Sequence, residues 1–194
     1  MAQNFSWFVL DPKAGDQLQQ TQTINVNTAP EVPAPFANLG DRVQGNNNSV
    51  WVFVQASTTV TAGNAVVWDN QFKANNATTT LAATAAVGKG IGIAQFYNPG
   101  FGPVGIISTL QVGTAQPGDY FWVANQGTGL VVNITSTAGT NAQLYLSTGN
   151  PGLMSSTAAT VAVRGLFSGT VGFTNTGSNI TTDAYAQVPM AASQ

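Results

Sequence analysis

The sequence predicts an all-β fold, with a small β-barrel or β-sandwich as its body and an extended N-terminal arm in front of it. From Val50 onward, short runs of β-branched and aromatic residues alternate with Gly, Pro, Asn and Asp turn signals, a spacing typical of sandwiches and barrels. No segment of about ten residues or more has the apolar periodicity of a helix. The start of the chain lacks the strand pattern, so we divide the chain into an arm, residues 1–48, and a β-rich body, residues 49–194.

The arm, residues 1–48, combines a short apolar patch, a Gln/Thr/Asn stretch and three prolines, Pro30, Pro33 and Pro35. Proline cannot donate to a strand ladder and holds the residue before it extended, so we expect no separate core here. The segment is either a flexible terminus or an arm that orders on a partner. Its aromatic residues favour the second interpretation, because solvated tails rarely carry so many. These aromatics are the candidate partner-contact residues: Phe5, Trp7, Phe8 and Phe36.

The first half of the body is expected to begin with a strand at Val50 and a hairpin around the turn Asp69–Asn70. The Ala-rich stretch Leu81–Val87 fits either a strand or a helical turn. A later strand alternates Gly with Ile and Ala, and glycine inside a strand usually marks a bulge or a close backbone approach. The expected strands, in chain order, are 50–54, 65–68, 71–74, 90–96 and 104–112.

The stretch Pro117–Val132 is expected to form a central hairpin. Tyr120–Val123 is an aromatic and β-branched run with two largely apolar faces, which suits a strand covered on both sides. Gly127-Thr-Gly129 has the composition of a turn, and Leu130 starts the returning strand. The remaining strands are expected over 142–147, 160–167, 169–174 and 184–190.

Two segments of the body resemble each other on either side of this central stretch. Thr61-Ala-Gly-Asn-Ala65 resembles Thr137-Ala-Gly-Thr-Asn-Ala142, and each leads through a turn to a further similar run, 86–91 or 162–166. One interpretation is that the body contains two similar β-units. The other is chance similarity in a sequence of low diversity, and the residues alone leave both open.

Composition excludes several functional classes. Charged residues make up 6% of the chain, against about 25% in an average domain. The net charge is −2, and the five cations are scattered, so a phosphate-binding stripe for nucleic acid or a basic patch for a membrane surface is not expected. The chain has no Cys and no His, which removes disulfides and thiolate or imidazole metal sites. We expect no signal peptide, no membrane span, no metal and no cofactor.

No motif in the chain predicts catalysis. The run Gly88–Gly92 contains Gly-Lys-Gly but lacks the glycine and the hydroxyl residue that a phosphate loop needs, with Ala83 and Gly90 in their places. Serine and threonine nucleophiles have no histidine base, and nothing singles out a pair among the seven carboxylates. Lys89 and Arg164 occupy similar places in the two repeat copies and are expected to be exposed charges. Five aromatics could stack on sugars, although core packing is their commoner fate: Trp51, Trp68, Tyr97, Trp122 and Tyr145.

Four segments carry a resemblance to a known family: Ala62–Val67, Ala86–Ala94, Gly118–Ala124 and Thr160–Gly165. With them, residues 50–174 resemble the decoration (cement) proteins of tailed-bacteriophage heads. In that family the first motif begins a strand pair, and the second and fourth resemble stretches that close a small barrel. The match does not cover the arm.

The resemblance implies a structural protein without catalytic residues that binds the outer capsid surface of a virion, with the major capsid protein as partner, often as a homotrimer. The runner-up function is a phage fibre or spike module that recognises host glycans through aromatic stacking. An enzyme with two carboxylates comes third. Phe5, Trp7, Phe8 and Phe36 remain the candidate contacts with a neighbouring subunit or the shell.

Overall fold

The fold was obtained as a computed structural model, which describes residues 21–22, 37–45, 48–83, 90–95, 113–135, 139–157, 161–169 and 180–193. The described part is nearly all β, which confirms the predicted fold class, and its helix, α1, spans only Thr79–Ala83. Within the described residues, no helix is long and apolar enough to cross a membrane.

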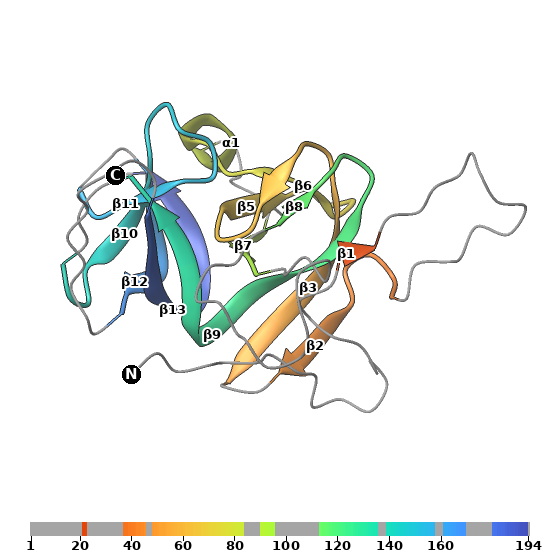
Figure 1. The fold of residues 1–194 in the computed structure, drawn as a ribbon, viewed down its shortest axis with the longest axis horizontal. Coiled ribbons are helices and arrows are strands. Elements are labelled where there is room, and N and C mark those ends of the chain that lie inside the picture. The colour runs from red at the N-terminus through yellow and green to blue at the C-terminus, as the bar shows by residue number, and fades with distance from the viewer. Residues whose placement is uncertain are drawn as a thin grey trace, which may run out of the picture.

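Five strands close into a small barrel, which we call the first ring. Each strand pairs with the next, and all pairs are antiparallel except the short parallel pair that joins β3 to β6. Figure 1 shows these strands gathered on the right of the molecule. In ring order they are β3 (Ser49–Ala56), β6 (Lys73–Asn76), β5 (Ala65–Trp68), β7 (Gly90–Ala94) and β9 (Tyr120–Ile134).

The second half of β9 belongs to another cycle of five paired strands, the second ring, on the left of Figure 1. This ring returns to β9 through one parallel pair, Ile134 of β9 with Met154 of β11. After β9 its strands, in ring order, are β13 (Ile180–Ser193), β12 (Val161–Ser168), β10 (Gln143–Leu146) and β11 (Met154–Ser155).

The two rings share strand order, strand direction and register. The closing parallel pair, Ala56–Ala74 in the first ring, corresponds to Ile134–Met154 in the second. Residues that lie the same number of positions before Ala56 in the first ring and before Ile134 in the second have equivalent antiparallel partners. The equivalent pairs are Val54–Phe121 with Val132–Thr182, Val52–Val123 with Leu130–Ala184, Ala94–Val123 with Ser168–Ala184, and Ala65–Ile93 with Gln143–Phe167. The similar sequence segments lead into β5 in one ring and into β10 in the other.

The predicted central hairpin is wrong, because β9 runs without a turn from Tyr120 to Ile134. Its first half pairs with β3 and its second half with β13, so each half is held in a different ring. Gly127 and Gly129 have φ angles of 147° and 73°, conformations that other residues rarely adopt. These glycines allow the strand to bend between the rings, where the sequence suggested a turn.

Most other predicted elements are present. The hairpin of β5 and β6 is confirmed, with Trp68 opposite Ala74, and the ambiguous stretch Leu81–Val87 begins in helix α1. The strands expected near 142–147, 160–167 and 184–190 are β10, β12 and part of β13. The strand expected over 104–112 lies outside the described residues, and so does the strand expected over 169–174 except for Gly169, which is not in a strand.

Three smaller pieces complete the fold. β2 (Arg42–Gly45) pairs with β3 and buries Val43, so residues 42–45, which the sequence analysis assigns to the arm, are part of the body sheet. β1 (Thr21–Gln22) pairs with the start of β9. β4 (Val60–Thr61) and β8 (Thr114–Ala115) form a separate two-stranded sheet.

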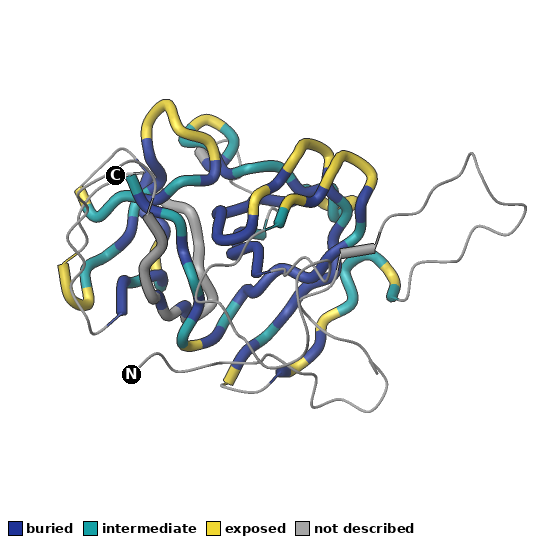
Figure 2. The backbone as a smooth tube through the Cα atoms, viewed as in Figure 1, coloured by how far each residue is buried: buried dark blue, intermediate teal, exposed yellow. Residues whose placement is uncertain are grey.

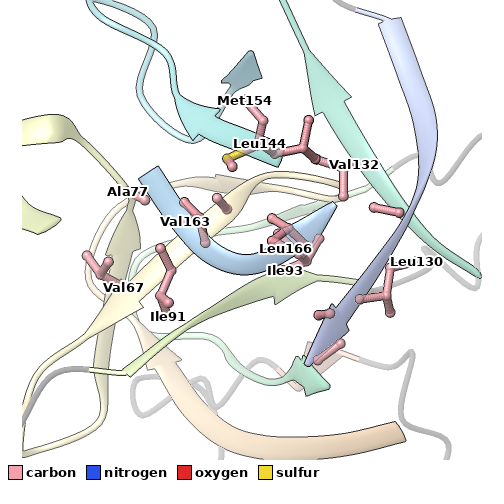
Figure 3. Packing of buried hydrophobic residues seen from close by; sticks show 14 of the residues in the cluster. Val67, Ala77, Ile91, Ile93, Leu130, Val132, Leu144, Met154, Val163 and Leu166 are labelled. Carbon is pink, nitrogen blue, oxygen red and sulfur yellow. The ribbon is translucent and has the colours of Figure 1, made fainter. Parts of the chain in front are cut away.

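Buried residues of the ring strands build two cores, and Figure 2 shows the buried stretches of the backbone in dark blue. One core fills the first ring and contains Val52, Val54, Trp68, Phe121 and Val123, among others. The other fills the second ring and extends onto the outer side of β5 and β7, where Figure 3 shows Val67, Ile91 and Ile93 close to Val163 and Leu166. The rings therefore bury apolar surface against each other.

Candidate interaction surface

The surface that we single out is the edge of β9 at Tyr120 and Phe121, where β1 joins it. The pairing is antiparallel, with Thr21 opposite Phe121 and Gln22 opposite Tyr120. β7 pairs with β9 only at Val123 and Ala124, so it leaves the backbone of Tyr120 and Phe121 open to β1. We call these two residues of β9 the acceptor edge.

An aromatic cluster lies beside the acceptor edge. Side chains alternate along a strand, so Tyr120 and Trp122 share one side of β9, as Trp51 and Phe53 share one side of β3. The Phe53 ring stacks on Tyr120 with centroids 5.9 Å apart and lies 5.0 Å from Trp122. Phe53 and Trp122 are at most 1% exposed, whereas Tyr120 is half-buried. Tyr120 of the acceptor edge thus packs against a buried aromatic side chain, Phe53.

The turn before β9 fixes the start of the acceptor edge. Gly118 adopts a φ of 96° and donates its N–H to Ala56 O at 2.8 Å, while Ala56 N donates to Asp119 O at 2.8 Å. The Gln55 amide donates to Gly118 O at 2.9 Å and accepts a hydrogen bond from the Lys73 ammonium. These contacts tie the turn to the end of β3, where the first ring closes.

Each carboxylate described in the turns accepts a backbone N–H of its own turn, as Asp commonly does. Asp119 is 5% exposed and accepts from Gln116 N at 2.8 Å, and Asp41 accepts from Asn38 N at 2.8 Å. Asp69 accepts from two N–H groups at 2.9 Å. Among the described residues no three acidic side chains gather as a metal site would require. Asp11, Asp16 and Glu31 lie outside the described residues, and the Asp183 side chain is not described.

Gly90 and Gly92 of the run Gly88–Gly92 serve packing, and Gly88 lies outside the described residues. A Cβ on Gly90 would lie 2.1 Å from the Trp68 ring, and a Cβ on Gly92 would lie 2.6 Å from Ala124 O. Both positions therefore need glycine for close approach inside the first ring. Arg164 is exposed on β12, as expected, and Lys89 lies outside the described residues.

Side-chain amides join the two rings. Asn133 of the second ring donates to Asn64 Oδ1 at 2.7 Å and to Ala62 O at 2.8 Å, and Asn64 donates to Asn76 Oδ1 at 3.0 Å. Gly152, in the turn between β10 and β11, exchanges backbone hydrogen bonds with Ala65 and Ala77 at 2.8 Å. We call Asn64, Asn76 and Asn133 the amide joint. It satisfies polar groups at the ring contact without any charged residue.

One buried donor has no partner in the described structure. The indole N–H of Trp122 finds no hydrogen-bond acceptor, although the residue is 1% exposed. Such groups are uncommon in folded proteins. Trp122 is the residue of β9 that directly follows the acceptor edge in the chain.

The other sequence-predicted residues divide into two groups. Trp51, Trp68 and Trp122 are at most 3% exposed, so they pack in the cores, while Tyr145 is half-buried on β10. Tyr97 lies outside the described residues, and so do the candidate partner contacts Phe5, Trp7, Phe8 and Phe36.

Neither the acceptor edge nor the amide joint has a signal in the sequence from which it could be predicted. Thr21 and Gln22 are two polar residues inside a Gln/Thr/Asn stretch, with no strand signal of their own. Asn64 and Asn133 are far apart in the chain, and only the sharing of β9 by both rings brings them together. The repeat was the one signal that pointed to two linked units.

Comparison of the chain with protein-family models, with curated proteins and with solved structures finds no match.

Proposed function

We propose that the protein is a structural decoration (cement) protein that binds the outer surface of a tailed-bacteriophage head and stabilises it. Its partner would be the major capsid protein, and the working form would be a homotrimer without a cofactor. The observation that carries this proposal is the resemblance of four sequence segments to that family. Those segments supply β5, β7, the start of β9 and β12, which are ring-forming strands.

The physical character of the described surface supports the same function. A cement protein is present in many copies, so like charges on its surface would repel across short distances on the shell. This chain has 12 charged residues among 194, and its ring contact uses side-chain amides and backbone groups. A rigid, nearly neutral body can be placed close to identical copies with little electrostatic cost.

The burial of the tryptophans in the cores weakens the alternative proposal of a glycan-binding module. Sugar stacking needs exposed aromatic faces, whereas Trp51, Trp68 and Trp122 are buried in the cores. We therefore keep one proposed function.

The test is co-sedimentation of the full chain with assembled empty heads of its phage, compared with its binding to unassembled capsid subunits and to a saccharide array. We expect binding to assembled heads and little binding to free subunits or sugars. Binding to saccharides together with no association with heads would contradict the proposal and favour the fibre or spike module.

A further inference from the structure

We propose that β1 is an exchanged strand: Thr21–Gln22 of one copy pairs with the acceptor edge, Tyr120–Phe121, of a neighbouring copy. In this arrangement the backbone pairing of β1 with the acceptor edge joins two copies of the chain. The inference rests on the oligomer of the proposed function and does not depend on shell binding.

β1 can leave its own chain without opening either ring. The first ring closes through β3 and β6, and β1 contributes no strand to it. In the second ring, the residues equivalent to the acceptor edge are Thr181 and Thr182 of β13, and no strand within the described ranges is paired with them on the β12 side. β1 is thus an addition to the repeated five-strand unit.

Exchange preserves the contacts that β1 makes. The strand has two residues and two partners on β9, and the same pairs form whether β1 comes from its own chain or from a neighbour. Exchange of an identical element is a low-cost route to oligomers for this reason. So short a pairing also leaves few hydrogen bonds to break during exchange.

The connecting chain is long enough for the exchange. Residues 23–36 separate β1 from Ala37, which packs against the body core, and an extended chain of this length spans roughly 45 Å. A body of this size has a diameter of about 40 Å. A strand anchored at Ala37 can therefore reach the acceptor edge of an adjacent copy.

The rest of the arm gives the exchange a driving force. Phe5, Trp7 and Phe8 precede β1, and Phe36 follows it. These residues lie outside the described part of the chain, and in an exchanged arrangement they would favour association wherever the contact between copies buries them. When each copy gives its strand to the next around a closed ring, every acceptor edge is filled and all copies are equivalent.

The chain has no cysteine, which allows a direct test by disulfide trapping. Gln22 lies opposite Tyr120, and directly opposed antiparallel residues have Cα atoms roughly 4.5 to 5.5 Å apart, within reach of a disulfide. We would refold the single variants Gln22→Cys and Tyr120→Cys together under mild oxidation. The control mixture pairs Gln22→Cys with Thr148→Cys, which places a thiol on an exposed turn of the second ring.

We expect a covalent heterodimer from the first mixture at several times the level of the control, and covalent oligomers from the double variant Gln22→Cys/Tyr120→Cys. A double variant that forms only an internal disulfide, with no heterodimer above the control in the mixture, would overturn the proposal.

A second full-length variant covers the case in which Tyr120→Cys disturbs the aromatic cluster. Proline at both positions of β1, Thr21→Pro/Gln22→Pro, removes every N–H that the strand could donate, while Gln22→Ala keeps the backbone donors. Light scattering should show the proline variant as a monomer and the alanine variant as an oligomer. Equal oligomers from both variants would refute the exchange.

These outcomes are separate from those of the proposed function. A chain that binds heads but gives only internal disulfides refutes strand exchange alone. A chain that forms the heterodimer but does not bind heads refutes the decoration function alone.

Discussion

Gly90 illustrates how single residues determine the interior of the first ring. Trp68 occupies the space over Gly90, and the equivalent side chain of the second ring, Leu146, is smaller. A Cβ at position 90 would overlap the Trp68 ring, so Gly90→Ala should destabilise the protein by about 1–3 kcal/mol. Gly139→Ala is the matched control, because its Cβ would meet only Ala142 Cβ at 3.8 Å. Denaturant unfolding checks both, and equal midpoints would contradict this packing.

The amide joint predicts a charge effect at a single residue. Asn133 donates two hydrogen bonds to oxygen atoms, and Asn133→Asp would place a carboxylate against the same oxygens. Loss of these donors should cost about 1–3 kcal/mol at neutral pH. At this half-buried position the neighbouring oxygen acceptors should disfavour the charged carboxylate and raise the pKa of the new carboxyl in the folded state, so the loss should diminish as the pH falls below that pKa. The exposed control, Asn70→Asp, should show little change, and an equal cost for both variants across the pH range would argue against the joint.

At the scale of elements, the sequence predicts correctly those turns and strands that are determined by neighbouring residues in the chain. The sequence predicts a turn at Asp69, and in the structure its carboxylate accepts two backbone N–H groups between β5 and β6. Gly127 and Gly129 predict a turn, because the local sequence does not show which strands will flank them. Partners from two rings hold β9 extended through both glycines, so tertiary pairing decided this element. β1 had no local signal, since its place depends on an edge that β7 leaves open.

The bend of β9 gives the prediction at this scale. Gly129 has a φ of 73°, which a β-branched residue tolerates poorly and asparagine tolerates better. Gly129→Val should therefore lower the free energy of unfolding by about 1–2 kcal/mol more than Gly129→Asn. Thermal unfolding of the two variants provides the comparison. A valine variant as stable as the asparagine variant would show that the bend does not need this conformation.

At the scale of the whole molecule, the two rings share a strand, a core contact and the amide joint. Unfolding one ring would release half of β9 and expose the apolar face between the rings, so we expect one cooperative transition. Trp51, Trp68 and Trp122 all belong to strands of the first ring, but Trp51 and Trp122 pack in the core that the second ring shares. In a Trp7→Phe variant their fluorescence therefore reports the first ring and its contact with the second, whereas far-ultraviolet circular dichroism reports all the strands. Coincident curves are expected, and two separated transitions would show rings that fold independently.

The low charge of the whole protein limits the forces that could hold it on a capsid shell, as we propose. With five basic and seven acidic residues, ion pairs can contribute little to an interface, and salt screens those that are exposed. Attachment should rest on apolar anchors and on backbone or amide hydrogen bonds. Trp7 and Phe36 are the proposed anchors, because they are aromatic residues of the arm.

Sedimentation of labelled protein with empty heads, across a salt series, tests this attachment most directly. Raising salt from about 0.05 M to about 0.5 M should change the Kd only a few-fold, because few charges are involved. Trp7→Ala or Phe36→Ala should weaken binding by about 2 kcal/mol where the residue is a hot spot. A steep loss of binding with salt, together with no effect of either substitution, would contradict the account.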